Sequence, residues 1–165
     1  DPDFFAAFIL NTIIGGNGIE SRLTAEVREK RGLTYGISTV LLTKDHANVM
    51  LGQVASANDR IGAAIEVIRD EWSKLAHDGV TAEELQAAQT YLTGAYPLRF
   101  DGNSQIARIL VGMQRQGLGL DYINTRNARI KAVTLSEINR VAARLLQPEA
   151  LNFVVAGQPT GLKEE

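Results

Sequence analysis

Residues 15–35 decide how this chain begins to fold, and they read GGNGIESRLTAEVREKRGLTY. The glycine-rich start predicts the end of one helix and a turn, because glycine adopts the backbone conformations found there at little cost. Ser21 is typical of a helix N-cap, and Gly32 closes the short, mostly solvated helix that follows. The β-branched residues after Gly32 then predict a strand.

The flanking segments extend this pattern. An apolar helix is predicted from Asp1-Pro2-Asp3 to Gly15-Gly16, with proline in its first turn. Residues 33–43 and 47–55 predict two strands joined by a turn, so an antiparallel hairpin is the simplest interpretation. One face of the first strand would carry Leu33, Tyr35, Ile37, Thr39 and Leu41.

The second half of the chain is predominantly helical in its patterns. Thr81 with Glu84 and Thr134 with Glu137 predict capping boxes at two helix starts. The short apolar run from Leu151 to Ala156 predicts a central strand. Helices are predicted over residues 61–79, 81–96, 104–116, 121–131 and 134–147.

This order of elements predicts an α+β fold in which an antiparallel or mixed sheet carries its helices on one face. It matches a split β-α-β layout except that no strand precedes the first helix. We therefore expect residues 1–165 to form a single α+β domain and to be a fragment of a longer chain, with the leading strand absent from it.

Composition excludes several classes of function. The net charge of −2 provides no positive field for nucleic acid, and the longest apolar stretch, Phe4 to Leu10, is too short for a membrane span. The absence of cysteine excludes disulfides, thiolate metal clusters and a cysteine nucleophile. A chain without cysteine suits the cytosol and the periplasm alike.

Few residues have the spacing of a known kind of site. His46 and His77 lie far apart and outside any zinc-binding spacing, so no metal site is predicted. The glycine-rich loop lies between two helices, a context that argues against a nucleotide loop and favours a helix end with a turn at positive φ. Arg28 and Tyr35 flank Gly32 and could share one rim, although a solvated charge and a half-buried strand aromatic are the simpler interpretation.

Residues 15–35 resemble the pitrilysin, insulinase and mitochondrial processing peptidase family of zinc metallopeptidases. Residues 78–85, 133–134 and 153–157 are similar to the helix starts and last strand of the same family, so the resemblance covers nearly the whole chain. It is a resemblance to the domain that lacks the metal, and it implies the α+β layout of metallohydrolase type.

The resemblance also implies roles for residues. Arg28 would bind a backbone carbonyl of the substrate, and Tyr35 would donate to the oxyanion that forms when water attacks the peptide. No cofactor is expected in this chain, whereas zinc is expected in a partner domain or subunit. A peptide or unfolded protein is the implied substrate. The implied substrate-binding residues are Gly15, Gly16, Asn17, Gly18 and Arg28.

Two other functions stay open. The chain could be a structural subunit that keeps the fold without activity, as the core proteins of respiratory complexes do. It could also be a peptide-binding module that captures extended chains at a sheet edge. A homo-oligomer is a further open alternative, nucleic acid and membranes are not expected as partners, and the style of the motif suggests a bacterial protein of the periplasm or cytoplasm.

Overall fold

The computed structural model describes residues 1–16, 20–44 and 46–162. It contains both strands of the predicted hairpin and a series of helices. In chain order the elements are α1 (Phe4–Gly15), η1 (Thr24–Glu29), β1 (Gly36–Thr43), β2 (Asn48–Ala55), α2 (Ile61–Asp78), α3 (Ala82–Ala95), η2 (Pro97–Arg99), α4 (Asn103–Arg115), α5 (Tyr122–Ala132), α6 (Leu135–Leu145) and η3 (Pro148–Ala150).

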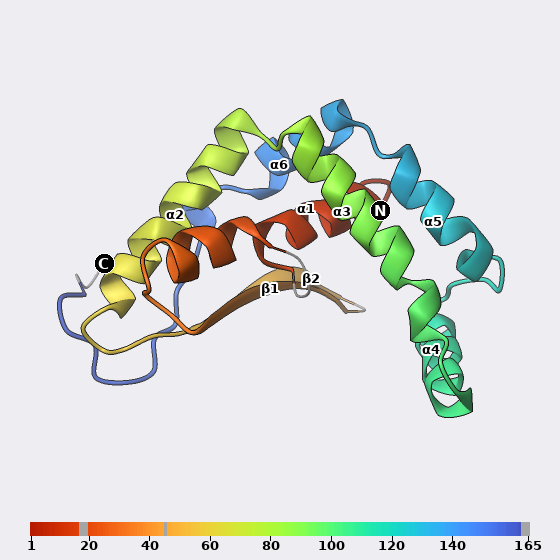
Figure 1. The fold of residues 1–165 in the computed structure, drawn as a ribbon, viewed down its shortest axis with the longest axis horizontal. Helices are drawn as coiled ribbons and strands as arrows, with labels where there is room; N and C mark the ends of the chain where they lie inside the picture. Colours follow the sequence, from red (N-terminus) through yellow and green to blue (C-terminus); the bar gives the residue numbers. More distant parts are fainter. Residues whose placement is uncertain (17–19, 45, 163–165) are drawn as a thin grey trace.

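The fold has two layers, a hairpin below and helices above it (Figure 1). β1 and β2 pair antiparallel, with Gly36 opposite Ala55 and Thr43 opposite Asn48. Helix α1 packs directly on β1, and α3 and α6 contact α1. The prediction of an α+β fold with helices on one face of an antiparallel sheet is therefore confirmed.

Helix α1 is the centre of the hydrophobic core. Ile9, Leu10 and Ile14 on it are fully buried, because the hairpin lies on one side of the helix and other helices on the other. Burying a side chain of this size stabilises the fold by about 1.5–3 kcal/mol. At its end the contact with β1 is so close that a Cβ on Gly15 would lie 2.7 Å from Thr39 Oγ1. Gly15 is therefore required by packing.

The capping residues predicted from sequence act as expected. Thr81 and Glu84 form one capping box, and Thr134 and Glu137 form another. Gly79 ends α2 with φ of 75°, a left-handed conformation that favours glycine. The predicted boundaries of α2 to α6 are confirmed to within one or two residues.

The predicted strand over Leu151–Ala156 is wrong, because the structure assigns no strand to these residues. Leu151 and Phe153 pack against the core while Val154 is 98% exposed, so the alternation of a strand is present. A strand also needs a neighbour that shares its backbone hydrogen bonds. No described segment pairs with this one in a sheet.

Helix α4 projects from the rest of the molecule (Figure 1). Met113 is buried on one face, whereas Val111 is 56% exposed. Among the described residues, none of the helices combines the length and apolar character that a membrane span requires.

Candidate functional site

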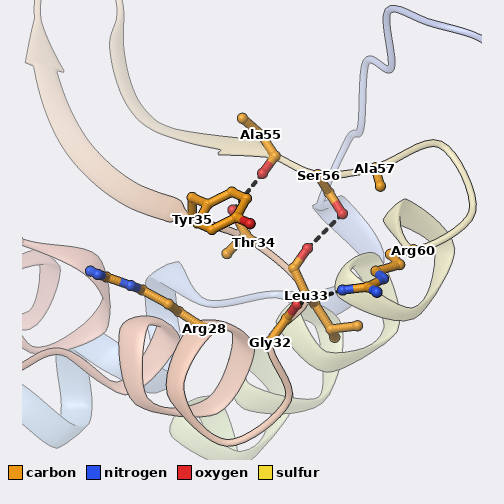
Figure 2. A pocket seen from close by; sticks show the side chains of 9 residues that line it. All are labelled: Arg28, Gly32, Leu33, Thr34, Tyr35, Ala55, Ser56, Ala57 and Arg60. Atoms are coloured by element: carbon orange, nitrogen blue, oxygen red, sulfur yellow. Dashed lines mark hydrogen bonds between the residues drawn. The ribbon is translucent and has the colours of Figure 1, made fainter.

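A cavity of about 700 Å³ opens where η1, the start of β1 and the end of β2 meet (Figure 2). It has both charged and apolar walls. Its described lining residues are Arg28, Gly32, Leu33, Thr34, Tyr35, Ala55, Ser56, Ala57 and Arg60. The two residues that the sequence singled out, Arg28 and Tyr35, thus belong to the same cavity.

Arg28 lies in a π-helical turn. The N–H of Lys30 donates to the carbonyl of Ala25 at 2.9 Å, one residue further along than in an α-helix. Val27, fully buried beside Arg28, fixes this turn to the core, so Arg28 projects into solvent. Short π-helical turns of this kind occur frequently at functional sites.

Gly32 turns the chain between Arg28 and Tyr35. Its φ of 60° is in the left-handed region, which a residue with a Cβ adopts only with strain. The Leu33 N–H donates to the carbonyl of Val27 at 2.9 Å and closes the bend. The glycine is therefore what allows η1 and β1 to present side chains to one opening.

Tyr35 lies outside the strand in which the sequence pattern placed it. Strand β1 begins only at Gly36, and the Tyr35 side chain is 97% exposed. The hydroxyl of Thr34 accepts from the Gly36 N–H and donates to the carbonyl of Ala55, which bends the backbone just before the strand. The half-buried strand aromatic is thus the wrong interpretation, and the phenol is free to meet a ligand.

Two further side chains fix this bend from the other wall of the cavity. The Ser56 hydroxyl donates to the carbonyl of Leu33 at 2.7 Å. Arg60 donates from one guanidinium nitrogen to the carbonyl of Gly32 at 3.1 Å, a contact drawn in Figure 2. The segment that joins Arg28 to Tyr35 is therefore held by β2 and by the loop before α2.

The two arginines at the cavity have no counter-ion among the residues that the structure describes. Glu26 on η1 pairs with Lys30 and Arg31, and these hydrogen bonds lower the pKa of Glu26 to about 2. Within the described part of the chain, by contrast, no ion pair involves Arg28 or Arg60. Both cations therefore keep most of their hydrogen-bond donors for a ligand.

The predicted glycine loop lies only partly within the described residues. Gly15 is buried against Thr39, and neither Gly15 nor Gly16 lines the cavity. Both have negative φ, so the prediction of a positive φ is wrong for them, and close packing on Thr39 and Thr12 requires glycine instead. Asn17 and Gly18 lie outside the described residues.

No metal centre is formed by the described residues. Among residues 1–16, 20–44 and 46–162, no three side chains of His, Asp or Glu gather as metal ligands would. His46 follows β1 near the hairpin turn and His77 lies in the last turn of α2, on separate elements. These donors do not fit a zinc ion, which takes four ligands in structural sites and three with water in catalytic ones.

Sequence reasoning missed Arg60, Ser56 and Thr34. Each side chain donates a hydrogen bond to a backbone carbonyl more than twenty residues away in sequence. A small polar residue just before the first strand, and another just after the second, are only a weak sequence signal for such contacts. No local sequence pattern indicates the role of Arg60, because its partner, the Gly32 carbonyl, comes within reach only when the hairpin forms.

Comparison with known proteins identifies the relatives of this chain. The family described as Peptidase M16 inactive domain matches residues 1–92. A Mycobacterium tuberculosis (strain H37Rv) protein described as an uncharacterized zinc protease is 32% identical over 143 residues, which are 86% of this chain and 32% of that protein. A Helicobacter pylori protein described as a non-peptidase homolog is 24% identical over 153 residues, 93% of this chain and 35% of its own length.

A solved structure has the same fold. The Pseudomonas fluorescens peptidase M16 inactive domain superposes with a TM-score of 0.76 at 28% identity, over 90% of this chain and 35% of that one. The chain therefore spans about a third of the relatives it matches. The matched family, the relatives and the fold agree with the resemblance in residues 15–35, and the chain belongs to the M16 peptidase family, in which it matches the inactive domain.

Proposed function

We propose that this domain supplies Arg28 and Tyr35 to a zinc peptidase whose metal is held by a partner domain. The observation that carries the proposal is that both side chains line one open cavity, with the Tyr35 phenol almost fully exposed. A fully solvated tyrosine gains no packing energy at that position. Its placement in one cavity with Arg28, which has no ion-pair partner among the described residues, is therefore better suited to a ligand than to the stability of the fold.

Each side chain has a distinct chemical task in this proposal. The planar guanidinium of Arg28 binds a backbone carbonyl of an extended peptide and holds it across the opening. The phenol of Tyr35 donates a hydrogen bond to the oxyanion that develops at the attacked carbonyl, an interaction stronger in the transition state than in the bound substrate. Zinc in the partner domain would supply the activated water.

The partner domain is part of the proposal for two reasons. The described residues lack a ligand set for zinc, and the chain spans about a third of relatives that are described as zinc proteases. We infer that this chain is the second, non-metal domain, joined to a zinc-bearing domain in the same polypeptide or in another subunit. The substrate would be a peptide or an unfolded protein, because the cavity is open to solvent at the end of the hairpin and has room for an extended chain.

The glycine loop keeps its predicted role in this proposal. Gly16 is only partly buried, and its extended backbone, with φ of −65° and ψ of 145°, leads away from α1. Of the described residues of this loop, Gly16 is the one that would approach substrate, since Gly15 is buried against Thr39, and the role of Asn17 and Gly18 stays a prediction. Assembly into a homo-oligomer likewise stays a prediction.

Replacing Tyr35 by phenylalanine tests the proposal directly. In the assembly that contains the zinc-bearing domain, Tyr35→Phe should lower kcat by about 10²–10³ with little change in KM, since one oxyanion donor is lost. Steady-state cleavage of a fluorogenic peptide measures both constants.

Tyr122→Phe is the matched control. Tyr122 lies on α5, stacked with Phe5 and outside the cavity, so the same loss of a hydroxyl there should leave kcat unchanged. Equal turnover of the Tyr35→Phe variant and the unmodified assembly would remove Tyr35 from the mechanism.

A subunit without catalytic activity is the second candidate. The Helicobacter pylori relative, described as a non-peptidase homolog, favours it. A structural subunit makes no use of the Arg28 and Tyr35 side chains. Peptide cleavage that is the same with Arg28→Gln, Tyr35→Phe and the unmodified chain would therefore support this alternative.

A further inference from the structure

The cavity has a second cation, Arg60, which the family resemblance does not single out. Arg60 directly precedes α2 and lines the same opening as Tyr35. Figure 2 draws Arg28 and Arg60 on opposite sides of the bend at Gly32 and Leu33, with the Tyr35 ring off the line between them. All three side chains line the same opening, so a peptide that fills it would contact each of them.

The charge of the cavity is uniformly positive. Its described lining residues include two arginines and no aspartate or glutamate. Some arginines elsewhere in the described chain pair with carboxylates, as Arg22 does with Glu84 at 2.6 Å and Arg144 with Asp3 at 2.9 Å. Among the described residues neither arginine of the cavity has a carboxylate partner, so the guanidinium charges at this opening are left for an incoming anion.

Arg60 is positioned before any ligand arrives. Its hydrogen bond to the Gly32 carbonyl occupies one guanidinium nitrogen and orients the side chain along the cavity wall. Among the described residues the other guanidinium donors have no hydrogen-bond partner, and the planar group can bind both oxygens of a carboxylate. Because the same bond holds the bend at Gly32, the arginine is tied to the segment that carries Tyr35.

We propose that Arg60 binds a carboxylate of the peptide, either an acidic side chain or the free C-terminus, while Arg28 and Tyr35 engage the backbone beside it. This inference rests on the proposed function, since it places the carboxylate relative to the peptide bond whose cleavage Tyr35 would assist. It assigns to the cavity a preference for anionic over neutral or cationic peptides.

The experiment compares matched peptides on the assembly with its zinc-bearing domain. One arm compares fluorescent peptides that differ by glutamate or glutamine at successive positions, and the other compares a free C-terminal acid with its amide. Fluorescence anisotropy gives Kd without requiring turnover, and cleavage gives kcat/KM. The acidic member of one series should bind about five-fold tighter, as expected for an exposed ion pair, and the preference should shrink in high salt.

Variants then assign the preference to Arg60. Arg60→Gln should abolish the preference, so that acidic and neutral peptides bind with the same Kd even if both are weakened by the lost bond to Gly32. Arg60→Lys should keep part of the preference because the charge remains but the planar fork is lost. Arg108→Gln is the control, since it removes the same charge from an exposed position on α4 outside the cavity. A preference in the glutamate and glutamine series assigns the site to a side-chain carboxylate. A preference in the acid and amide series assigns it to the C-terminus.

The outcomes separate this inference from the proposed function. Equal Kd values for acidic and neutral peptides, or an equal loss of both in Arg60→Gln, would overturn the carboxylate site even where Tyr35→Phe lowers kcat. An acid preference that depends on Arg60 supports the site even where Tyr35→Phe leaves kcat unchanged, and in that case only the catalytic proposal fails.

Discussion

Arginines differ in their partners between two regions of this molecule. Near the N-terminus of α3, Arg22 reaches both oxygens of Glu84 at 2.6 and 2.8 Å, and near the N-terminus of α1, Arg140 and Arg144 bind Asp3. At the cavity, Arg28 and Arg60 face solvent without a carboxylate among the described residues. The two groups of arginines thus differ in whether a carboxylate lies within reach. Those with one stabilise the fold, and those without one are left for a ligand.

The ion pairs that stabilise the fold also lower the pKa values of their carboxyl groups. Burial raises the pKa of the Glu84 carboxyl, but the hydrogen bonds from Arg22 and Thr81 outweigh it and the pKa is lowered overall. The hydrogen bond from Arg140 likewise lowers the pKa of Asp3. Both carboxylates therefore stay ionised and paired at neutral pH.

Removing the charge of Glu84 should have the largest effect on stability. Glu84→Gln keeps the shape of the side chain but leaves the partly buried guanidinium of Arg22 without a counter-ion, which should lower the free energy of unfolding by about 2 kcal/mol. Urea unfolding followed by circular dichroism measures the loss. Glu83→Gln, its exposed neighbour in α3, is the control and should change stability by less than about 0.5 kcal/mol. Similar losses in both variants would contradict a structural role for the pair.

Glu26 should show a smaller, pH-dependent effect. Its folded pKa of about 2 lies below the ordinary 4.5, so its stabilisation is complete above pH 4.5 and is lost as the pH falls toward 2. Glu26→Gln should therefore cost at most about 1 kcal/mol at pH 7, since the pair is near the surface, and less at pH 3. Unfolding curves at the two pH values test this, and a cost that does not change with pH would exclude the ion pairs as its source.

Arg28 should have the smallest effect on stability and a clear effect on function. Arg28→Gln breaks no ion pair among the described residues, so the free energy of unfolding should stay within about 0.5 kcal/mol of the original value. In the assembly with the zinc-bearing domain, kcat/KM for a peptide should fall about ten-fold, because a charged hydrogen bond to the substrate is lost. A loss of stability as large as that of Glu84→Gln would place Arg28 with the structural arginines.

Much of the fold could be predicted from local patterns. The helix spacing of α2, the capping boxes of α3 and α6, and the hairpin of β1 and β2 all depend on residues close together in sequence. The predicted strand over residues 151–156 failed for the opposite reason, because strand pairing depends on a neighbour that local sequence does not name. For the candidate site, the sequence pointed to Arg28 and Tyr35, but local pattern alone favoured a half-buried strand position for Tyr35, whereas the structure leaves it 97% exposed just before the strand.

Local sequence alone determined which segments form α2 to α6 and the hairpin, because helix periodicity, caps and turn residues act over a few positions. It also carried the family resemblance. Only the tertiary structure decided that Arg60 and Ser56 hold the bend at Gly32 and that Tyr35 is solvated. Those contacts join segments more than twenty residues apart, and they exist only once β1 has paired with β2 and α2 has packed against η1.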